Sequence, residues 1–103
     1  MYGIVWEFRV RAGAERAFID GYDANGAWVR LFRRSQGFRG TELTRSVRDL
    51  RVFYTLDTWE SEDCYQEFRR TCQQEYEALD KSFEGLTEQE RLVGILSAPA
   101  ASH

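Results

Sequence analysis

The chain opens on a regular alternation of apolar and polar side chains. In residues 2–10, YGIVWEFRV, every second position is apolar or aromatic. A period of two is typical of a β-strand that buries one face. Ala12 and Gly13 interrupt the alternation, and apolar residues over 14–22 then follow the wider spacing of an α-helix. The pattern therefore predicts a strand followed by a helix.

A second helical stretch follows residues 23–26, DANG, where we expect a kink or a short loop. Trp28, Leu31 and Phe32 repeat at intervals of three and four, as in the buried stripe of a helix. Gly37 is a natural helix stop, because glycine enters left-handed backbone geometry without a Cβ clash. We therefore expect this helix to end at Gly37.

Two further alternating stretches, 38–47 and 51–59, flank a tight turn over 48–50 and predict a β-hairpin. A three-residue turn sets the register, because residues equally distant from the turn face each other. The opposed pairs are then Leu43 with Thr55, Thr41 with Asp57, and Arg39 with Trp59.

Only one side of this hairpin can face the helices. We expect that side to carry Glu42, Tyr54 and Leu56, with Gly40 leaving space beside them. A slip of the register by one residue would exchange the two faces.

Ser61 is predicted to be an N-cap, since its side chain can accept a hydrogen bond from the first turn of a helix. Apolar residues then recur every three or four positions, so we expect one long amphipathic helix that ends near Lys81. Thr87 and Glu90 have the spacing of a capping box, and a single helical turn is expected there before a last strand over 91–96.

The order strand, helix, strand, strand, helix, strand predicts an α+β fold of the ferredoxin-like βαββαβ type. Such a chain closes as a four-stranded antiparallel sheet with both helices on one face. With 103 residues the chain is long enough for one core and too short for two. We expect a single domain over 1–96 and a loosely ordered C-terminal tail over 97–103.

The second face of this sheet would remain uncovered. It would carry Leu43, Phe53 and Trp59, and an apolar face of that extent is a liability in a monomer. Two sheets packed face to face would bury it, with Arg9 and Asp57 paired inside as ions. We therefore predict a two-fold homodimer through the sheet face.

The net charge, the hydropathy and the cysteine positions argue against several classes of partner and site. A net charge of −3, with arginines interleaved among carboxylates, argues against a nucleic-acid partner. No apolar run approaches a membrane span and no signal peptide is recognisable, so we expect a cytoplasmic protein with no membrane partner. Cys64 and Cys72 lie too far apart along one helix for a disulfide. With the single histidine at His103, no metal site is expected.

Aromatic residues make up 15% of the chain, more than a one-layer core is expected to bury. We expect some of these rings to line a cavity between the sheet and the helices, where they offer a stacking surface for a flat aromatic ligand. Plain core packing is the alternative for any single ring. The candidate substrate-binding residues are Trp6, Phe8, Tyr22, Trp28, Phe32, Tyr65, Phe68 and Cys72.

Glu42 is the first candidate for a catalytic group. If its carboxylate points toward the helix layer, burial would raise its pKa and suit it to accept a proton from a phenol. Tyr54, on the same predicted face, is the second candidate, because its hydroxyl could hold a water for the same step. A salt bridge to an arginine of the first helix, or an edge position in water, is the structural alternative for Glu42.

Several motifs, taken in order, resemble the antibiotic biosynthesis monooxygenase family of dimeric α/β barrels. They are WVRLF from Trp28, GFRGTEL from Gly37, YTLDTWES from Tyr54 and YQEF from Tyr65. The resemblance implies a dimer of ferredoxin-like protomers, each with a small-molecule pocket between its sheet and its helices. Some members are cofactor-free oxygenases of polycyclic phenols or quinols, some degrade haem, and many have no known activity.

The haem-degrading branch fits this chain poorly. Its members use an asparagine on the first strand, a tryptophan on the long helix and a histidine iron ligand further along that helix. Trp6, Phe68 and Ala78 occupy these places here. The resemblance without an axial histidine therefore disfavours haem degradation.

The resulting hypothesis is a cofactor-independent monooxygenase that acts on a phenolic, quinol or polyketide-like molecule. No flavin is expected, because the chain lacks a glycine-rich nucleotide loop. The alternative is a non-catalytic protein of the same fold that binds a hydrophobic metabolite or only assembles.

Overall fold

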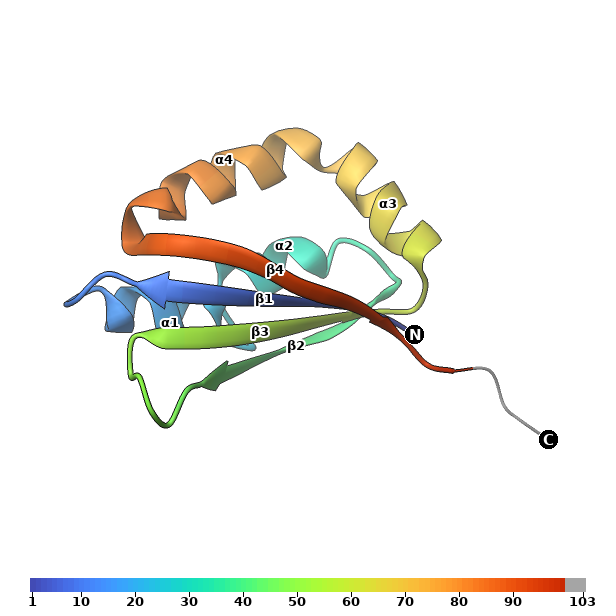
Figure 1. The fold of residues 1–103 in the computed structure, drawn as a ribbon. Helices are drawn as coiled ribbons and strands as arrows, with labels where there is room; N and C mark the ends of the chain where they lie inside the picture. The colour runs from blue at the N-terminus through green and yellow to red at the C-terminus, as the bar shows by residue number, and fades with distance from the viewer. Residues whose placement is uncertain (100–103) are drawn as a thin grey trace.

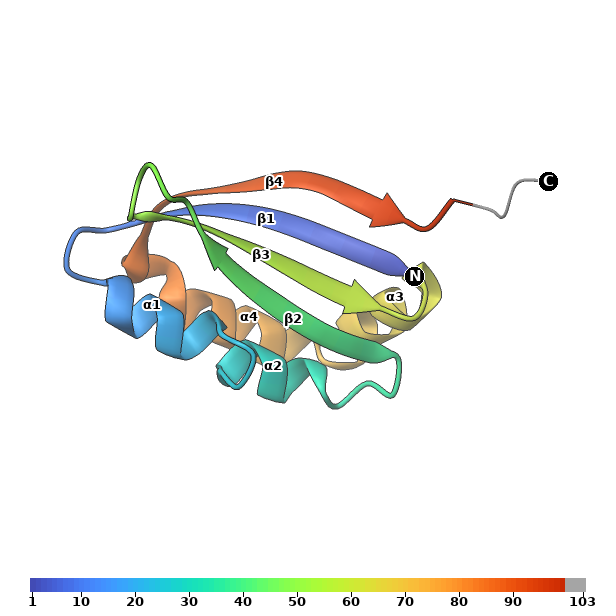
Figure 2. The ribbon, with the colours of Figure 1, turned by 90° about the horizontal axis from the view of Figure 1, so that it is seen from below.

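All four α-helices lie on one face of a four-stranded antiparallel sheet (Figure 1, Figure 2). The computed structural model describes residues 1–99. Its elements are β1 (Tyr2–Val10), α1 (Glu15–Tyr22), α2 (Ala27–Phe32), β2 (Phe38–Arg45), β3 (Val52–Trp59), α3 (Glu62–Thr71), α4 (Gln73–Phe83), the 3₁₀ turn η1 (Glu84–Leu86) and β4 (Thr87–Ser97).

The strands are ordered β2-β3-β1-β4, and every neighbouring pair is antiparallel. The strongly alternating β1 therefore lies inside the sheet, with its apolar face toward the helices. This order confirms the predicted α+β, ferredoxin-like fold.

The predicted helix stop at Gly37 is wrong. α1 and α2 are separated near the expected kink, but α2 already ends at Phe32, and Gly37 does not adopt a positive φ. A Cβ added to Gly37 would lie 2.5 Å from the Cβ of Cys64 on α3. The glycine therefore allows the backbone before β2 to pass close to α3.

The predicted long helix is two helices that meet at Cys72. Ser61 caps α3 as predicted, because its Oγ accepts a hydrogen bond from the backbone N–H of Cys64 at 3.2 Å. Cys72 then leaves helical geometry, with φ −112° and ψ 26°. α4 continues in a different direction, so that the pair bends over the sheet (Figure 1).

β4 begins at Thr87 rather than at residue 91. Thr87 pairs with Val10 and Glu90 pairs with Phe8 on β1, so the predicted capping box does not form. The backbone groups of both residues are satisfied by the sheet instead, and η1 supplies a helical turn just before the strand. β4 continues through Ser97, and residues 100–103 of the predicted tail lie outside the described residues.

The predicted hairpin register holds in the middle of the two strands. Thr41 faces Asp57 and Leu43 faces Thr55. This agreement follows from the short turn between β2 and β3, which leaves little freedom in the pairing.

The register fails at the start of β2. A β-bulge between Phe38 and Gly40 places Phe38, not Arg39, opposite Trp59. Gly40 has φ +149°, a backbone geometry that side chains rarely allow. The glycine predicted to leave space in a pocket therefore serves the bulge.

The faces of the hairpin are exchanged relative to the prediction. β3 pairs with β1 so that Phe53 lies opposite Phe8 and Trp59 opposite Tyr2. Paired residues share a face of the sheet, and the rings of β1 point to the helices. Phe53 and Trp59 are accordingly 1% and 0% exposed, whereas Tyr54 points to the open face.

The core between the sheet and the helices consists mainly of aromatic rings. Phe18 and Tyr22 stack with their ring centroids 4.1 Å apart. Phe32 meets Phe68 edge-on at 5.4 Å and also packs edge-on against Trp59 at the same centroid distance. The rings of α1, α2 and α3 thus share one continuous core.

The predicted ion pair between Arg9 and Asp57 is wrong. Asp57 lies on the helix-facing side of β3, and Arg9 pairs with Asp49 in the hairpin turn at 2.8 Å. The cause is the exchange of faces, which moves Asp57 away from the open face.

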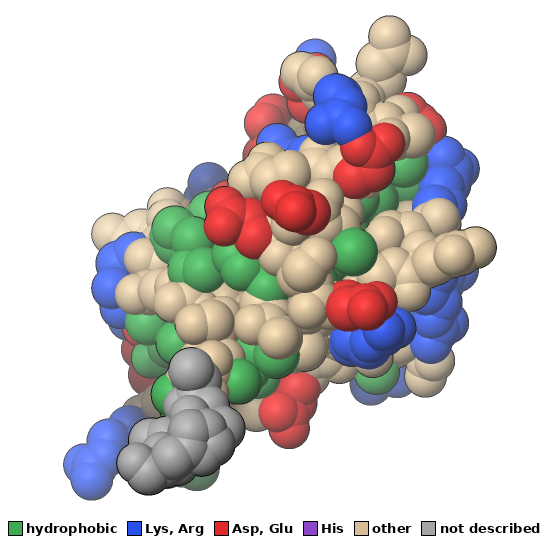
Figure 3. Space-filling view, turned by 90° about the vertical axis from the view of Figure 1, so that its right-hand side faces the viewer, with side chains coloured by type: hydrophobic (Ala, Val, Ile, Leu, Met, Phe, Trp, Pro, Cys, Tyr) green, Lys and Arg blue, Asp and Glu red, His purple; other side chains and the backbone are tan. Residues whose placement is uncertain are grey.

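β4 forms one edge of the sheet and exposes apolar side chains. Leu92, Val93 and Leu96 are each 44% exposed, and Ile95 is 54% exposed. Figure 3 looks onto the end of the molecule where β4 finishes, and apolar side chains reach the surface there among polar ones. Within residues 1–99, no helix is long and apolar enough to span a bilayer.

Candidate functional site

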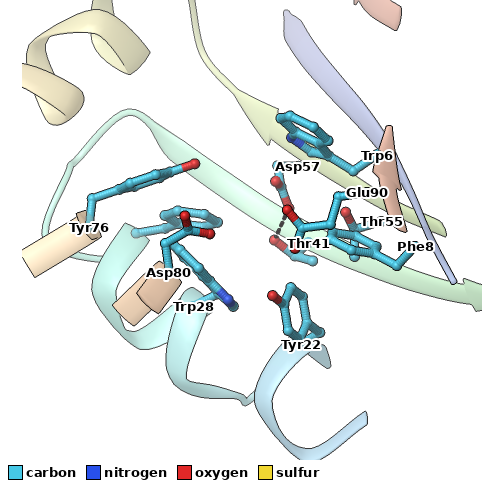
Figure 4. Close-up of a pocket in the computed structure, with 11 residues that line it drawn as sticks. Trp6, Phe8, Tyr22, Trp28, Thr41, Thr55, Asp57, Tyr76, Asp80 and Glu90 are labelled. Carbon is cyan, nitrogen blue, oxygen red and sulfur yellow. Dashed lines mark hydrogen bonds between the residues drawn. The ribbon is translucent and has the colours of Figure 1, made fainter. Parts of the chain in front are cut away.

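A cavity lies between the helix-facing side of the sheet and the helices (Figure 4). Its volume is about 160 Å³, whereas one water needs only roughly 10–15 Å³. The cavity can therefore hold a small organic molecule. Its lining consists of Trp6, Phe8, Tyr22, Trp28, Phe32, Thr41, Thr55, Asp57, Tyr76, Asp80 and Glu90.

Aromatic rings from four elements form most of the cavity wall. Trp6 points inward because β1 alternates between its two faces. Tyr22 ends α1 and Trp28 belongs to α2, and their ring centroids lie 6.0 Å apart. Tyr76, near the start of α4, meets Trp28 edge-on at 5.0 Å. The wall offers ring faces and edges at angles that suit contact with a flat ligand.

Asp57 is the buried acid of the cavity and is only 9% exposed. Its neighbour across the sheet is Thr41, whose hydroxyl donates a hydrogen bond to Asp57 Oδ1 at 2.7 Å. Burial raises the pKa of Asp57 to about 6, and the bond from Thr41 offsets only part of this rise. No salt bridge reaches Asp57 within residues 1–99. A carboxyl group that titrates near neutral pH is suited to proton transfer.

Tyr22 and Trp28 bring polar groups to the aromatic wall. Burial raises the pKa of the Tyr22 hydroxyl, and the nearby indole N–H of Trp28 opposes part of the shift. Within the described chain, Trp28 Nε1 makes no hydrogen bond of good geometry, although the residue is only 7% exposed. A buried, unpaired indole N–H is costly, so a ligand oxygen beside it would be stabilised.

Two further carboxylates, Asp80 on α4 and Glu90 on β4, line the cavity at its solvent-exposed rim. Figure 4 shows them reaching into the same space from these two elements. Partial burial raises the pKa of the Glu90 carboxyl, the charge of Asp80 raises it further, and a hydrogen bond with Thr87 lowers it. The lining contains three carboxylates and no arginine, lysine or histidine.

Five of the eight predicted substrate-binding residues line this cavity, and the other three do not. The five are Trp6, Phe8, Tyr22, Trp28 and Phe32. Their roles in binding remain predictions.

Tyr65, Phe68 and Cys72 lie in the adjoining core beneath α3. The ring of Tyr65 packs edge-on against Trp59 at 5.3 Å, and Phe68 contacts the same indole at 5.1 Å. The bend after α3 explains their position, because only α4 is directed over the cavity. A single straight helix would instead carry the side chains of both α3 and α4 to the same wall.

The predicted orientation of Glu42 and Tyr54 is wrong, because both point away from the helices. Glu42 is exposed and pairs with Leu56 across the open face. The Tyr54 hydroxyl donates a hydrogen bond to Glu7 Oε2 at 2.6 Å, and this bond is the main cause that raises the pKa of Tyr54. Neither side chain lines the cavity.

Sequence reasoning missed Asp57 as the acid of the cavity, together with Thr41 and the rim carboxylates. The signal that could have found Asp57 lies in β3 itself. Asp57 shares a face with Phe53 and Trp59, and together these two side chains carry more apolar surface than Tyr54 and Leu56 on the other face. Assigning the more apolar face to the core would have placed Asp57 there as well.

The model of the antibiotic biosynthesis monooxygenase family matches residues 1–82 of this chain. This match covers most of the chain and confirms the resemblance found in its motifs. No curated protein sequence matches the chain significantly.

Solved structures share the fold over nearly their whole length. Rv0793 from Mycobacterium tuberculosis is 16% identical with a TM-score of 0.73, and 99% of this chain and 98% of that chain are covered. PA3566 from Pseudomonas aeruginosa is 16% identical with a TM-score of 0.72, covering 96% and 94%. SnoaB, a cofactor-independent oxygenase from Streptomyces nogalater, is 17% identical with a TM-score of 0.67, covering 97% and 94%. At these identities the likeness shows the fold alone.

Proposed function

This chain belongs to the antibiotic biosynthesis monooxygenase family, and from that premise we propose that its cavity binds a phenol or quinol and promotes its oxygenation without an added cofactor. The observation that carries the proposal is Asp57, a buried carboxyl in an aromatic cavity with a pKa of about 6. The same fold in a cofactor-independent oxygenase supports it. Asp57 replaces Glu42 as the base, and Tyr54 has no part in the step.

Proton transfer to Asp57 begins the reaction. Above its pKa, Asp57 is ionised and can accept the proton of a phenol, whose own pKa in water is roughly 10. A hydrogen bond to the phenolate oxygen would lower that difference, and the Trp28 indole N–H and the Tyr22 hydroxyl beside it are donors in the cavity lining. Thr41 holds the carboxylate through Oδ1 and thereby fixes its direction.

The resulting electron-rich anion is the reductant and molecular oxygen is the oxidant. In the monooxygenation of a polycyclic phenol that carries a ring methylene, this methylene becomes a carbonyl with one oxygen atom of O₂, and its two hydrogens leave with the other oxygen atom as water. In the simpler oxidation of a hydroquinone, two electrons and two protons pass to oxygen, which gives the quinone and hydrogen peroxide. Asp57 accepts the first proton in either case.

Oxygen uptake with a panel of quinols and polycyclic phenols tests the enzymatic proposal. We expect uptake by the wild type and a loss of about 10²- to 10⁴-fold in Asp57→Asn, the usual size of a general-base effect. Glu42→Gln removes a carboxylate from the open face and serves as the matched control, with unchanged uptake. Equal rates in wild type and Asp57→Asn would contradict the role of Asp57. Binding of the panel without any oxygen uptake would leave the non-catalytic binding protein as the function.

We also propose that two copies pair through the open face of the sheet. The apolar side chains of Val5, Leu56 and the 44% exposed Leu96 lie on this face, which supports a covered face. The polar cluster of Glu7, Tyr54 and Arg91 would then lie inside the interface. A stable monomer in sedimentation equilibrium would contradict this proposal.

A further inference from the structure

The charged residues of the cavity lining restrict the choice of ligand more than its aromatic walls do. Three carboxylates line it, and no basic side chain does. We propose that the ligand carries a positive charge: an aromatic compound with a protonated amine, whose ring lies among the aromatic side chains and whose ammonium group lies at the rim between Asp80 and Glu90. This inference rests on the proposal that the cavity is the ligand site.

The rim carboxylates lack a cation of their own. Asp80 on α4 and Glu90 on β4 make no salt bridge within residues 1–99, and the charge of Asp80 adds to the effect of burial in disfavouring ionisation of Glu90. An ammonium group between them would relieve this repulsion and interact with both.

The nearby basic residues make their direct contacts elsewhere, although Arg69 lies within electrostatic range of Asp80. The guanidinium of Arg69 lies over the ring of Tyr76 at 3.8 Å and donates to the Tyr65 hydroxyl at 3.0 Å. Arg91, next to Glu90 in the chain, points to the opposite face of the sheet and bonds Glu7 at 3.2 Å. Neither lines the cavity.

The aromatic wall favours the same ligand charge. Ring faces attract cations, and this attraction increases when the cation is partly removed from water. An anionic ligand would meet three carboxylates and the negative faces of the rings in a space of about 160 Å³. A carboxylated aromatic should therefore be excluded.

The unpaired indole N–H sets the orientation of the ligand. Trp28 Nε1 lies in the buried part of the wall beside the Tyr22 hydroxyl, with which it makes no hydrogen bond of good geometry, so a ligand hydroxyl oxygen is a suitable partner. A ligand with a phenol at one end and an ammonium at the other would satisfy Trp28 and Asp57 with the first group and the rim carboxylates with the second. An aryl-alkylamine with a ring hydroxyl has this form.

Three phenols with short para side chains of different charge test the inference. Tyramine is cationic, 4-ethylphenol is neutral and 3-(4-hydroxyphenyl)propionate is anionic. Each is titrated into the full chain at pH 7.5, with calorimetry and tryptophan fluorescence as readouts, since Trp6 and Trp28 line the cavity. We expect tyramine to bind about tenfold tighter than 4-ethylphenol and the propionate to bind weakest, with the preference reduced in high salt.

Single substitutions assign the preference to the rim. Asp80→Asn and Glu90→Gln should each weaken tyramine binding about threefold to tenfold and leave 4-ethylphenol binding unchanged. Glu77→Gln is the matched control, because it removes the same charge from α4 at an exposed position outside the cavity. It should change neither affinity.

The outcomes separate this inference from the proposed function. Equal binding of the three phenols, or tighter binding of the propionate, would overturn the cationic ligand and leave the cavity as a phenol site. Failure of all three to bind or to perturb the tryptophan fluorescence would overturn both. Loss of preference in Glu77→Gln as large as in the rim variants would show a general charge effect and would overturn the assignment to the rim.

Discussion

Each face of the sheet holds a carboxylate beside a hydroxyl, and the pKa values of the two carboxylates are shifted in opposite directions. On the helix-facing side, Asp57 accepts from Thr41, and burial raises its pKa to about 6. On the open face, Glu7 accepts from Tyr54 and Arg91, and these bonds lower its pKa. A neighbouring hydroxyl therefore does not by itself raise the pKa of a carboxyl group. Burial without a nearby cation raises this pKa, because burial penalises the charged form.

The strongest test of this comparison is the stability of neighbouring residues on β3 that point to opposite faces. Phe53→Ala should lower the free energy of unfolding by about 3–5 kcal/mol, because it leaves a cavity in the aromatic core. Tyr54→Ala should cost about 1 kcal/mol, because it removes a half-buried ring and one hydrogen bond. Urea denaturation at equal protein concentration measures both. A larger loss in Tyr54→Ala would mean that the faces are assigned wrongly.

The next effect is the pH dependence of stability, where the two carboxylates should act in opposite senses. The folded pKa of Asp57, about 6, exceeds the ordinary value of roughly 3.9. The folded state therefore binds the proton more tightly, and stability falls as pH rises from about 4 to 6. Asp57→Asn should raise the free energy of unfolding at pH 7 by about 3 kcal/mol and have little effect below pH 4.

Glu7→Gln should do the reverse, because the pKa of Glu7 is lowered in the folded state. Its ionised form contributes stability at neutral pH, and this contribution is lost as the pH falls through the folded pKa. The variant should therefore be less stable than the wild type at pH 7, with the difference closing in acid. Thermal unfolding across pH 3–8 compares the two variants, and shifts of the same sign would break the comparison.

The smallest expected effect concerns what covers the open face. Leu56→Glu places a charge in the middle of that face and should raise the dimer dissociation constant at least about tenfold. Val47→Glu adds the same charge at the hairpin tip, where Val47 is 93% exposed, and should leave association unchanged. Sedimentation velocity over a concentration series measures both. Equal association of the two variants would argue against pairing through this face.

The difference between the two faces of the sheet also explains how much of the candidate site could be predicted from the sequence. The rings Trp6, Tyr22 and Trp28 were predicted to share a cavity, and they do, because each lies on an element whose buried face is marked by a clear period. The acid was misassigned. Glu42 and Asp57 both lie on strands of the hairpin, and the alternation of these strands does not distinguish which of them turns toward the helices.

The sequence by itself determined the order of the elements, the cap at Ser61, and the pairing of Thr41 with Asp57. These features depend on short-range geometry: the alternation of a strand, the first turn of a helix, and the closure of a short hairpin. Each is satisfied within a few residues or across one tight turn, so the local pattern is sufficient.

The alternation of β3 left open which of its faces is buried, and tertiary structure decided this and with it the identity of the acid in the cavity. β3 is apolar on both sides, so its alternation fits either orientation. Pairing with β1 resolves the choice, because Phe53 and Trp59 join the rings of Phe8 and Tyr2 and bury more apolar surface than Tyr54 and Leu56 would. Asp57 is carried inward with them.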